Sequence, residues 1–210
     1  MPVVAVTGSR SGAGKTRFIE RLLDACAGAA VIKGTPEERG PGIVDDPEIL
    51  RVPGTDTARF LSAGAGTVLW VRSGRETLET ALGDAVRRAG PGLVIVESGA
   101  AFRVPGVFLR VFVDGGPDKP GAPDRRAAAD RVVSDPFDAM DGVVRRIQEV
   151  VKMSEDRARA LIRERQKDGR LSCAELFRIS EEADVSKKRM GELMNELDYK
   201  VVHCQLGCFP

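Results

Sequence analysis

A lysine and a threonine near the start of the chain have the setting of a phosphate-binding site. Lys15 and Thr16 follow a glycine-rich stretch that contains Gly8, Gly12 and Gly14. Glycine lets successive backbone amides curl around an anion, the lysine ammonium can reach the outer phosphates, and the threonine hydroxyl can hold Mg²⁺. We therefore expect a nucleotide here, with Lys15 as the catalytic group that stabilises phosphate charge. The predicted nucleotide-binding residues are Gly8, Ser11, Gly12, Ala13, Gly14, Lys15, Thr16 and Arg17.

The spacing of this loop differs by one residue from the usual pattern. Counted back from Gly14, the first glycine of that pattern falls on Ser9, whereas the chain has its glycine one position earlier, at Gly8. The loop therefore has the form G-x5-G-K-T. A strand-like run precedes it and a helical run follows it, which favours a phosphate loop over a chance glycine turn.

Carboxylates elsewhere in the chain could complete a magnesium site. Glu97 follows four apolar residues and closes a predicted strand, at the sheet edge where the phosphate loop would also lie. A carboxylate there can hold Mg²⁺ directly or through water. Asp45, Asp46 and Asp56 compete for the second acidic position, and their types and spacing do not choose among them. The single histidine, His203, lies far along the chain, so chemistry at the loop would rest on carboxylates, lysine, metal and water.

The thiols near the C-terminus form a second candidate site. Cys204 and Cys208 lie four residues apart beside His203, and Cys173 lies earlier in the same part of the chain. This spacing lacks the paired C-x2-C arrangement of structural zinc sites. Free thiols are the simpler interpretation, and whether these cysteines hold a metal stays open.

The elements that must position these residues alternate between strands and helices. Most of the expected strands are apolar throughout, which is typical of a parallel sheet with helices on both faces. Residues 1–150 are therefore predicted to form an α/β nucleotide-binding domain of the P-loop NTPase type. The expected strands cover residues 3–7, 29–33, 67–71, 93–97, 107–113 and 132–133.

Start and stop signals predict where the helices of this domain lie. A short helix should begin after Thr55 and end at Gly64. The spacing Ser73-x-x-Glu76 predicts a capping box before the next helix, and residues 137–150 should form a closing helix. Residues 34–53, rich in glycine, proline and acidic side chains, are expected to form a long loop.

Residues 151–210 differ in amino-acid composition from the preceding part of the chain and are predicted to form a second, mainly helical domain. Ser154, Ser172 and Ser186 are placed to cap three helices, and a strand-like segment follows at 199–204. Two helices joined by a tight turn and followed by a strand have the outline of a helix-turn-helix or winged-helix unit.

A basic trio opens the last of these helices. Lys187, Lys188 and Arg189 could touch nucleic-acid phosphates, but Glu181, Glu182 and Asp184 lie close by and acidic residues nearly balance basic ones across the domain. A DNA reader is usually far more basic on its docking face. DNA binding is therefore possible but not favoured, and a protein-interaction or dimerisation role is the stronger prediction.

The composition sets broad limits on the whole chain. Its 210 residues are 42% hydrophobic and 30% charged, with a formal net charge of +1. This composition is typical of a soluble globular protein. The net charge is too small to create an electrostatic field that would steer the protein to nucleic acid or membrane. No signal stretch opens the chain and no apolar run approaches the length of a membrane span, so we expect a cytoplasmic protein.

The first 150 residues resemble the molybdopterin-guanine dinucleotide biosynthesis adapter family, GTP-binding P-loop proteins of the SIMIBI class of NTPases. The stretches that carry the resemblance are 11–16, 31–33, 53–65 and 93–97. The resemblance implies Mg²⁺-dependent binding of GTP or ATP, a weak GTPase or ATPase activity at most, and a part in molybdenum-cofactor biosynthesis. It implies a homodimer and a partner among cofactor-biosynthesis proteins or molybdoenzymes. Thr16 and Glu97 would serve Mg²⁺, with Asp56 beside them.

Two other functions stay open. The stretch from Thr7 to Thr16, together with Glu97, is similar to dethiobiotin synthetase, which would imply an ATP-dependent enzyme acting on a small molecule. A nucleotide-gated regulator that acts through the C-terminal domain is the other alternative. The choice between guanine and adenine is also open, because no N-K-x-D run is present and residues 114–119 are only a plausible place for base contacts.

Overall fold

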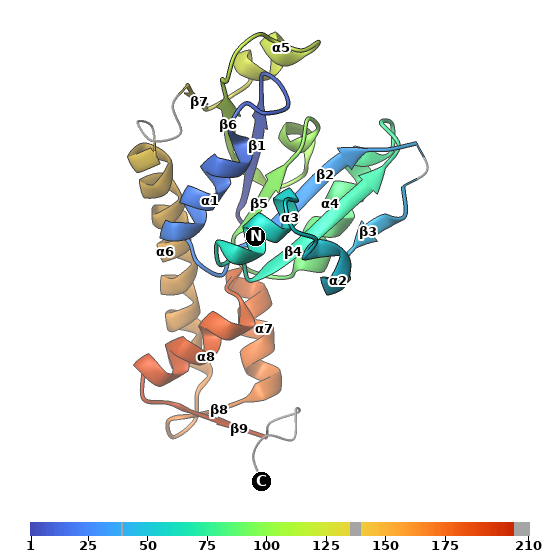
Figure 1. The fold of residues 1–210 in the computed structure, drawn as a ribbon. Coiled ribbons are helices and arrows are strands. Elements are labelled where there is room, and N and C mark those ends of the chain that lie inside the picture. Colours follow the sequence, from blue (N-terminus) through green and yellow to red (C-terminus); the bar gives the residue numbers. More distant parts are fainter. Residues whose placement is uncertain (39, 135–139, 204–210) are drawn as a thin grey trace. The chain divides into compact units, whose positions relative to one another are not determined.

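The computed structural model describes residues 1–38, 40–134 and 140–203 (Figure 1). Its internal contacts divide the chain into two compact units. The larger, called here the sheet unit, consists of Pro2–Ala89 and Val94–Ile147. The smaller, called the C-terminal unit, consists of Met1, Gly90–Leu93 and Gln148–Pro210.

A mostly parallel sheet forms the centre of the sheet unit, as the run of apolar segments predicts. Its order is β3-β4-β2-β5-β1-β6-β7, seven strands in the described residues, and only β3 runs antiparallel to its neighbour. The strand bounds are β1 Val3–Gly8, β2 Ala30–Pro36, β3 Gly42–Val44, β4 Thr67–Ser73, β5 Val94–Glu97, β6 Val107–Val113 and β7 Arg131–Val133.

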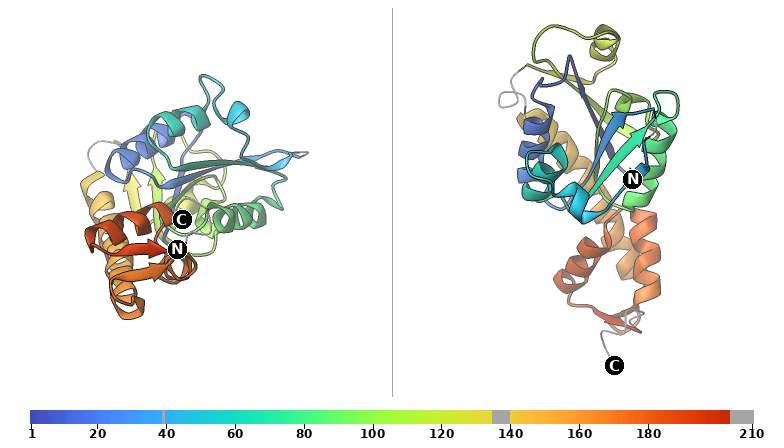
Figure 2. Two further views of the ribbon diagram at one scale, coloured as in Figure 1. Left: turned by 90° about the horizontal axis from the view of Figure 1, so that it is seen from below. Right: turned by 45° about the vertical axis from the view of Figure 1, so that its right-hand side comes forward.

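Helices cover both faces of this sheet, which explains why its strands are apolar throughout. Helices α1 (Lys15–Ala25) and α3 (Asp56–Ser62) lie on one face and α4 (Leu78–Ala89) on the other (Figure 2). All residues of β1 are buried, because strands in the middle of a covered sheet have no solvent-facing side. Phe18 and Leu22 of α1 and Leu82 of α4 are completely buried against it.

The register of the central strands brings the ends of β1, β2 and β5 to one level. Val6 of β1 pairs with Glu97 of β5, and Glu97 pairs with Lys33 of β2. Because the three strands are parallel, the segments that follow them leave from the same edge. That edge holds the loop that leads from β1 into α1.

The segment from 34 to 53 is more ordered than the loop expected there. Strand β2 continues to Pro36, β3 pairs with β4, and a short helix α2 covers Pro47–Leu50. Asp46 caps this helix by accepting a hydrogen bond from the Glu48 amide, and Pro47 occupies its first turn, where a missing N–H costs nothing. The polar composition hid an extension of β2 and two short elements, which tertiary pairing and a local cap stabilise.

The two predicted helix starts in this region have different outcomes. Thr55 caps α3 as expected, since its hydroxyl accepts a hydrogen bond from the Ala58 amide at 3.2 Å. The capping box at Ser73 is wrong: Ser73 is the last residue of β4, and α4 begins only at Leu78. Pairing of β4 with β2 through Ser73 outweighs the local capping signal. The unit also contains the 3₁₀ turn Ala101–Arg103 and α5 (Ala122–Ala127).

A single helix, α6 (Met140–Arg165), replaces the two helices predicted on either side of residue 151. Ser154 lies in its interior, so the predicted cap at that position is wrong. No glycine or proline occurs between Val143 and Arg165, and a serine alone does not end a helix. The division between the two units falls inside this helix, after Ile147. Phe137, where the closing helix was predicted to begin, lies outside the described residues.

The C-terminal unit is mainly helical, with two short strands. Helices α7 (Cys173–Ala183) and α8 (Lys187–Glu196) begin at the caps predicted for them, Ser172 and Ser186. Strands β8 (Arg170–Ser172) and β9 (Lys200–Val202) pair in parallel. A separate apolar core holds the unit together, consisting of Ala158, Ile162, Leu171, Leu176, Ile179, Ala183, Val185, Met190, Leu193 and Met194.

Candidate nucleotide and magnesium site

The loop between β1 and α1 has the backbone shape that an anion cradle needs. Gly12 and Gly14 adopt left-handed conformations, with φ of +78° and +92°, which non-glycine residues reach only with strain. Gly14 caps α1 without a side-chain hydrogen bond. The first amides of an 11-residue helix therefore face this loop with the positive end of the helix dipole behind them.

Lys15 opens α1 and its ammonium lies within this loop. Its Nζ donates to the Arg10 carbonyl at 2.9 Å and lies 3.9 Å from a carboxylate oxygen of Glu97. Burial lowers the pKa of Lys15, an effect that the negative charge of Glu97 partly opposes. The geometry holds a cation between the loop backbone and the acidic edge of β5, where phosphate oxygens could replace the carbonyl.

The unusual spacing of the loop has a structural explanation. A Cβ at Gly8 would lie 2.6 Å from the Val113 carbonyl, so this glycine is needed for the close packing of β1 against β6. Ser9, at the position of the usual first glycine, is completely buried. Its amide donates to Val113, and its hydroxyl accepts a hydrogen bond from the Gly115 amide at 3.0 Å.

The structure brings Thr16, Asp56 and Glu97 together. The Thr16 hydroxyl donates to Asp56 at 2.8 Å, and Asp56 and Glu97 share contacts with the ammonium of Lys33. Asp45 instead pairs with Arg88, and Asp46 caps α2. Of the three aspartates that the sequence left in competition, Asp56 is the one placed beside Thr16.

Lys33 also belongs to the candidate site, although the sequence did not predict it there. Its Nζ lies 2.6 Å from Asp56 Oδ2 and 2.9 Å from Glu97 Oε2. Burial pushes the pKa of Lys33 down, but the charge of Glu97 and the hydrogen bonds to both carboxylates outweigh it, so the pKa is raised. Burial alone would raise the pKa of Asp56, but the hydrogen bond from Lys33 outweighs that effect, so the pKa of Asp56 is lowered. The signal available in the sequence was a lysine at the end of an otherwise apolar strand.

The segment 114–119, a plausible place for base contacts, packs directly on the glycine-rich loop between β1 and α1. The Arg10 side chain donates to the Gly115 carbonyl at 3.0 Å, and the Lys119 amide donates to the Ser9 carbonyl at 2.9 Å. Asp114 and Asp118 both pair with Arg126, at 3.1 and 2.9 Å. The structure thus joins backbone groups of this segment to side-chain and backbone atoms of the loop.

The residues present fit a phosphate group and a magnesium ion. Lys15, the glycine-rich backbone and the start of α1 supply donors for phosphate. Asp56, Glu97 and the Thr16 hydroxyl supply the hard oxygens that Mg²⁺ prefers. No group of three or more His, Cys, Asp or Glu residues suited to a metal occurs among the described residues. A magnesium ion here would therefore draw its remaining ligands from phosphate and water, as Mg²⁺ commonly does.

The other predicted nucleotide-binding residues lie in the same loop or just after it. Ser11 and Gly12 are exposed, Ala13 is buried, and Arg17 is exposed in the first turn of α1. Cys204 and Cys208 lie outside the described residues. Cys173 is buried, and Cys26, half-buried at the end of α1, has a pKa raised by burial.

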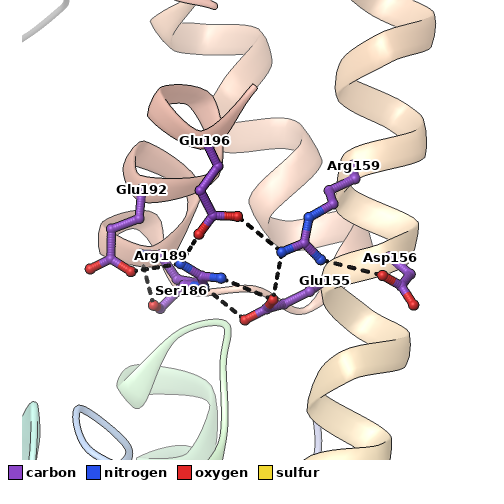
Figure 3. A network of polar contacts seen from close by, with 7 residues as sticks. All are labelled: Glu155, Asp156, Arg159, Ser186, Arg189, Glu192 and Glu196. Carbon is purple, nitrogen blue, oxygen red and sulfur yellow. Dashed lines mark hydrogen bonds and ion pairs between the residues drawn. The ribbon is translucent and has the colours of Figure 1, made fainter. Parts of the chain in front are cut away.

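Two members of the basic trio in the C-terminal unit are engaged within that unit. The guanidinium of Arg189 makes two hydrogen bonds to Glu155, at 2.7 and 3.0 Å, and others to Glu192 and Glu196 (Figure 3). Lys187 lies over the ring of Phe177, 4.4 Å from its centre. These contacts use charge that a DNA-binding face would present to phosphates.

Comparison with known proteins finds no matching family model, no matching curated protein and no matching solved structure. No helix in the described ranges is long and apolar enough to cross a membrane.

Proposed function

We propose that this protein binds a nucleoside triphosphate with Mg²⁺ at the edge of the sheet unit, in the manner of a P-loop NTPase. The observation that carries the proposal is the meeting of Thr16, Asp56 and Glu97 beside a loop with left-handed glycines and Lys15. Lys15 and Thr16 belong to α1, Asp56 to α3 and Glu97 to β5, and the glycines lie in the loop between β1 and α1. A cation, two carboxylates and open helix amides at one strand edge match what a magnesium–triphosphate group requires.

Each side chain has a defined part in this proposal. Lys15 would leave the Arg10 carbonyl and neutralise phosphate oxygens, while the loop amides donate to them. Thr16, Asp56 and Glu97 would hold Mg²⁺, which supplies charge stabilisation when it is bound. No histidine lies in the sheet unit to act as a base, so any hydrolysis would depend on positioned water and charge stabilisation and would be slow.

The test is a titration of the intact chain with GTP and ATP, with and without Mg²⁺. We expect Mg²⁺-dependent binding that Lys15→Ala weakens about tenfold to hundredfold, because charge-assisted hydrogen bonds to phosphate are lost. Arg21→Ala, on the exposed side of the same helix, is the matched control and should bind as the unchanged chain does. Lack of binding to either nucleotide, or equal binding by the Lys15 variant, would contradict the proposal.

The sequence resemblance extends the proposal to molybdenum-cofactor biosynthesis. The most specific stretch of that resemblance, residues 53–65, forms the capped helix α3 that carries Asp56. An adapter role predicts GTP as the preferred nucleotide, a homodimer, and faster formation of molybdopterin guanine dinucleotide when the chain is added to the synthesising enzyme. A rate unchanged by the chain would leave nucleotide binding standing and remove this assignment.

A second candidate is a nucleotide-gated regulator that acts through the C-terminal unit. The observation in its favour is the pair α7 and α8, each capped by serine and joined at Asp184 in a left-handed turn. DNA binding by this pair would fall steeply with salt and weaken in a Lys187→Ala, Lys188→Ala double variant. Arg189, already bonded to three carboxylates, is the trio member whose replacement should matter least to such binding.

A further inference from the structure

Lys33 contacts the same two carboxylates that the proposed magnesium site requires. Its ammonium engages Asp56 Oδ2 at 2.6 Å and Glu97 Oε2 at 2.9 Å. The other oxygen of Asp56 accepts the Thr16 hydroxyl, and the other oxygen of Glu97 lies 3.9 Å from Lys15. One oxygen of each carboxylate is thus committed to Lys33.

The charge balance of the site explains why a cation is held there. Glu97 is only 2% exposed, and Asp56 is half-buried beside it. Two carboxylates that converge in a partly dry site repel each other and lose hydration unless a positive group compensates them. Lys33 supplies that charge from within the chain, with two charge-assisted hydrogen bonds.

The sheet holds the backbone of Lys33, whereas its ammonium is held by side-chain contacts to Asp56 and Glu97. Lys33 pairs with Glu97 in the register between β2 and β5 and with Trp70 in the register between β2 and β4. Its backbone is therefore held on both sides by the sheet. The flexible stem of a lysine allows the ammonium to leave the carboxylates without any shift of the strand.

We propose that Lys33 is a tethered cation that competes with Mg²⁺ for Asp56 and Glu97, so that metal entry requires displacement of the lysine ammonium. The inference rests on the proposed magnesium-nucleotide function. Mg²⁺ must therefore compete with the ammonium of Lys33 for the two carboxylates. The phosphates that accompany the metal supply additional ligands. Weak binding of the metal alone and strong binding with nucleotide follow from the same competition.

The experiment measures binding of Mn²⁺ alone, followed by the electron paramagnetic resonance signal of the free ion. It compares the unchanged chain with Lys33→Met, with Lys33→Gln, which keeps a hydrogen-bond donor, and with Arg59→Met. Arg59 is an exposed arginine of α3 that donates hydrogen bonds to Glu20 and whose charge acts on Asp56, so the last variant controls for removing a positive charge nearby. We expect both Lys33 variants to bind Mn²⁺ about tenfold tighter or more, since the competing charged contacts are gone, and Arg59→Met to stay close to the unchanged chain.

A second measurement uses heat denaturation of the same four proteins. Without metal, both Lys33 variants should unfold at a lower temperature than the unchanged chain, because two carboxylates lose their counter-charge. Saturating Mn²⁺ should raise the unfolding temperature more in these variants than in the unchanged chain.

Equal or weaker Mn²⁺ binding by both Lys33 variants overturns the competition. If the unchanged chain then still binds Mg²⁺–nucleotide in a Lys15-dependent way, the proposed function stands and only this inference fails. If the unchanged chain binds neither Mn²⁺ nor nucleotide, the proposed function fails with it.

Discussion

At the residue scale, Ser9 shows how one side chain can take over a position that glycine usually fills. It is completely buried, and its hydroxyl is the acceptor for the Gly115 amide. Its own amide and carbonyl bond to Val113 and Lys119. Ser9 thereby joins the glycine-rich loop after β1 to the segment that follows β6, which glycine could do only through its backbone.

Replacement of Ser9 by alanine should destabilise the sheet unit. The half-buried Gly115 amide would lose its acceptor, and loss of such a hydrogen bond costs about 1 kcal/mol. Denaturant unfolding would show the loss as a lower free energy of unfolding. Ser11→Ala, on an exposed residue of the same loop, should change it little, and an equal effect of both variants would argue against the role assigned to the Ser9 hydroxyl.

The residues of the candidate site could be predicted only in part from the sequence. The sequence predicts the candidate phosphate loop and Glu97 as site residues because the local pattern places both at a strand end. Asp56 could not be separated from Asp45 and Asp46 by spacing, because the choice depends on where α3 packs. Lys33 was missed as a site residue for the same reason: its partners lie 23 and 64 residues away along the chain.

At the element scale, α3 positions an acidic side chain through its first turn. Thr55 caps the helix, and Asp56, the next residue, accepts from Thr16 of α1. The Thr55 hydroxyl also lies 3.0 Å from that of Thr57. The orientation of the site carboxylate therefore depends on how α3 begins.

Loss of the α3 cap should affect both stability and metal dependence. Thr55→Ala is expected to cost about 1 kcal/mol of folding free energy and to reduce the effect of Mg²⁺ on nucleotide affinity, because Asp56 is less well fixed. Thr55→Ser keeps the hydroxyl and should restore both properties. Trp70, the single tryptophan of the chain, lies in register with Lys33, so its fluorescence is a suitable readout. A Ser variant as impaired as the Ala variant would count against the cap.

The ion pairs between α6 and α8 should make the C-terminal unit sensitive to acid. The hydrogen bond from Arg189 holds the pKa of Glu155 below its ordinary value, and the hydrogen bonds from Arg159 and Arg189 lower that of Glu196. Both carboxylates bind protons less readily when folded than when unfolded. Their stabilising contribution is therefore complete near neutral pH and is lost as the pH falls below about 5.

Arg189→Met tests this pH dependence. The variant should unfold at a lower temperature at pH 7, where the network is fully charged, and should lose less stability than the unchanged chain as the medium is acidified. Arg178→Met removes an exposed arginine of α7 that bonds to Glu175 and serves as control. Parallel pH profiles for the unchanged chain and the Arg189 variant would show that the network does not set the acid response.

Elements were predicted well where local signals and tertiary contacts agree. Strands β1, β5 and β6 are apolar runs that the sheet buries, and α7 and α8 begin at their serine caps. The errors at Ser73 and Ser154 share one cause. Each serine has the chemistry of a cap, but strand pairing in one case and an unbroken helical stretch in the other prevailed over it.

At the scale of the whole molecule, all groups of the candidate site belong to the sheet unit. Lys15, Thr16, Lys33, Asp56 and Glu97 lie within Pro2–Ala89 and Val94–Ile147. The order β2-β5-β1 in the sheet brings together residues from distant parts of the chain. The α/β class was predictable from alternation of apolar and helical stretches, whereas the strand order was not, because apolar parallel strands give no signal of which neighbour each will take.

Saturation with Mg²⁺ and nucleotide should stabilise the sheet unit in particular. A ligand at one hundred times its dissociation constant contributes about 2.7 kcal/mol. Hydrogen exchange on the intact chain should slow in β1, α1 and α3 and change little in α7 and α8. Uniform slowing across both units would instead point to coupling between them, as the regulator candidate requires.

The glycine before Ser9 has a consequence for how such loops are found in other sequences. Gly8 serves the packing of β1 against β6, and its neighbour Ser9 completes the loop through a hydroxyl. A search pattern that demands glycine as the first letter of the motif would pass over this loop. A pattern that also allows a serine or threonine at that position, with glycine immediately before it, would find other sequences with the same loop arrangement.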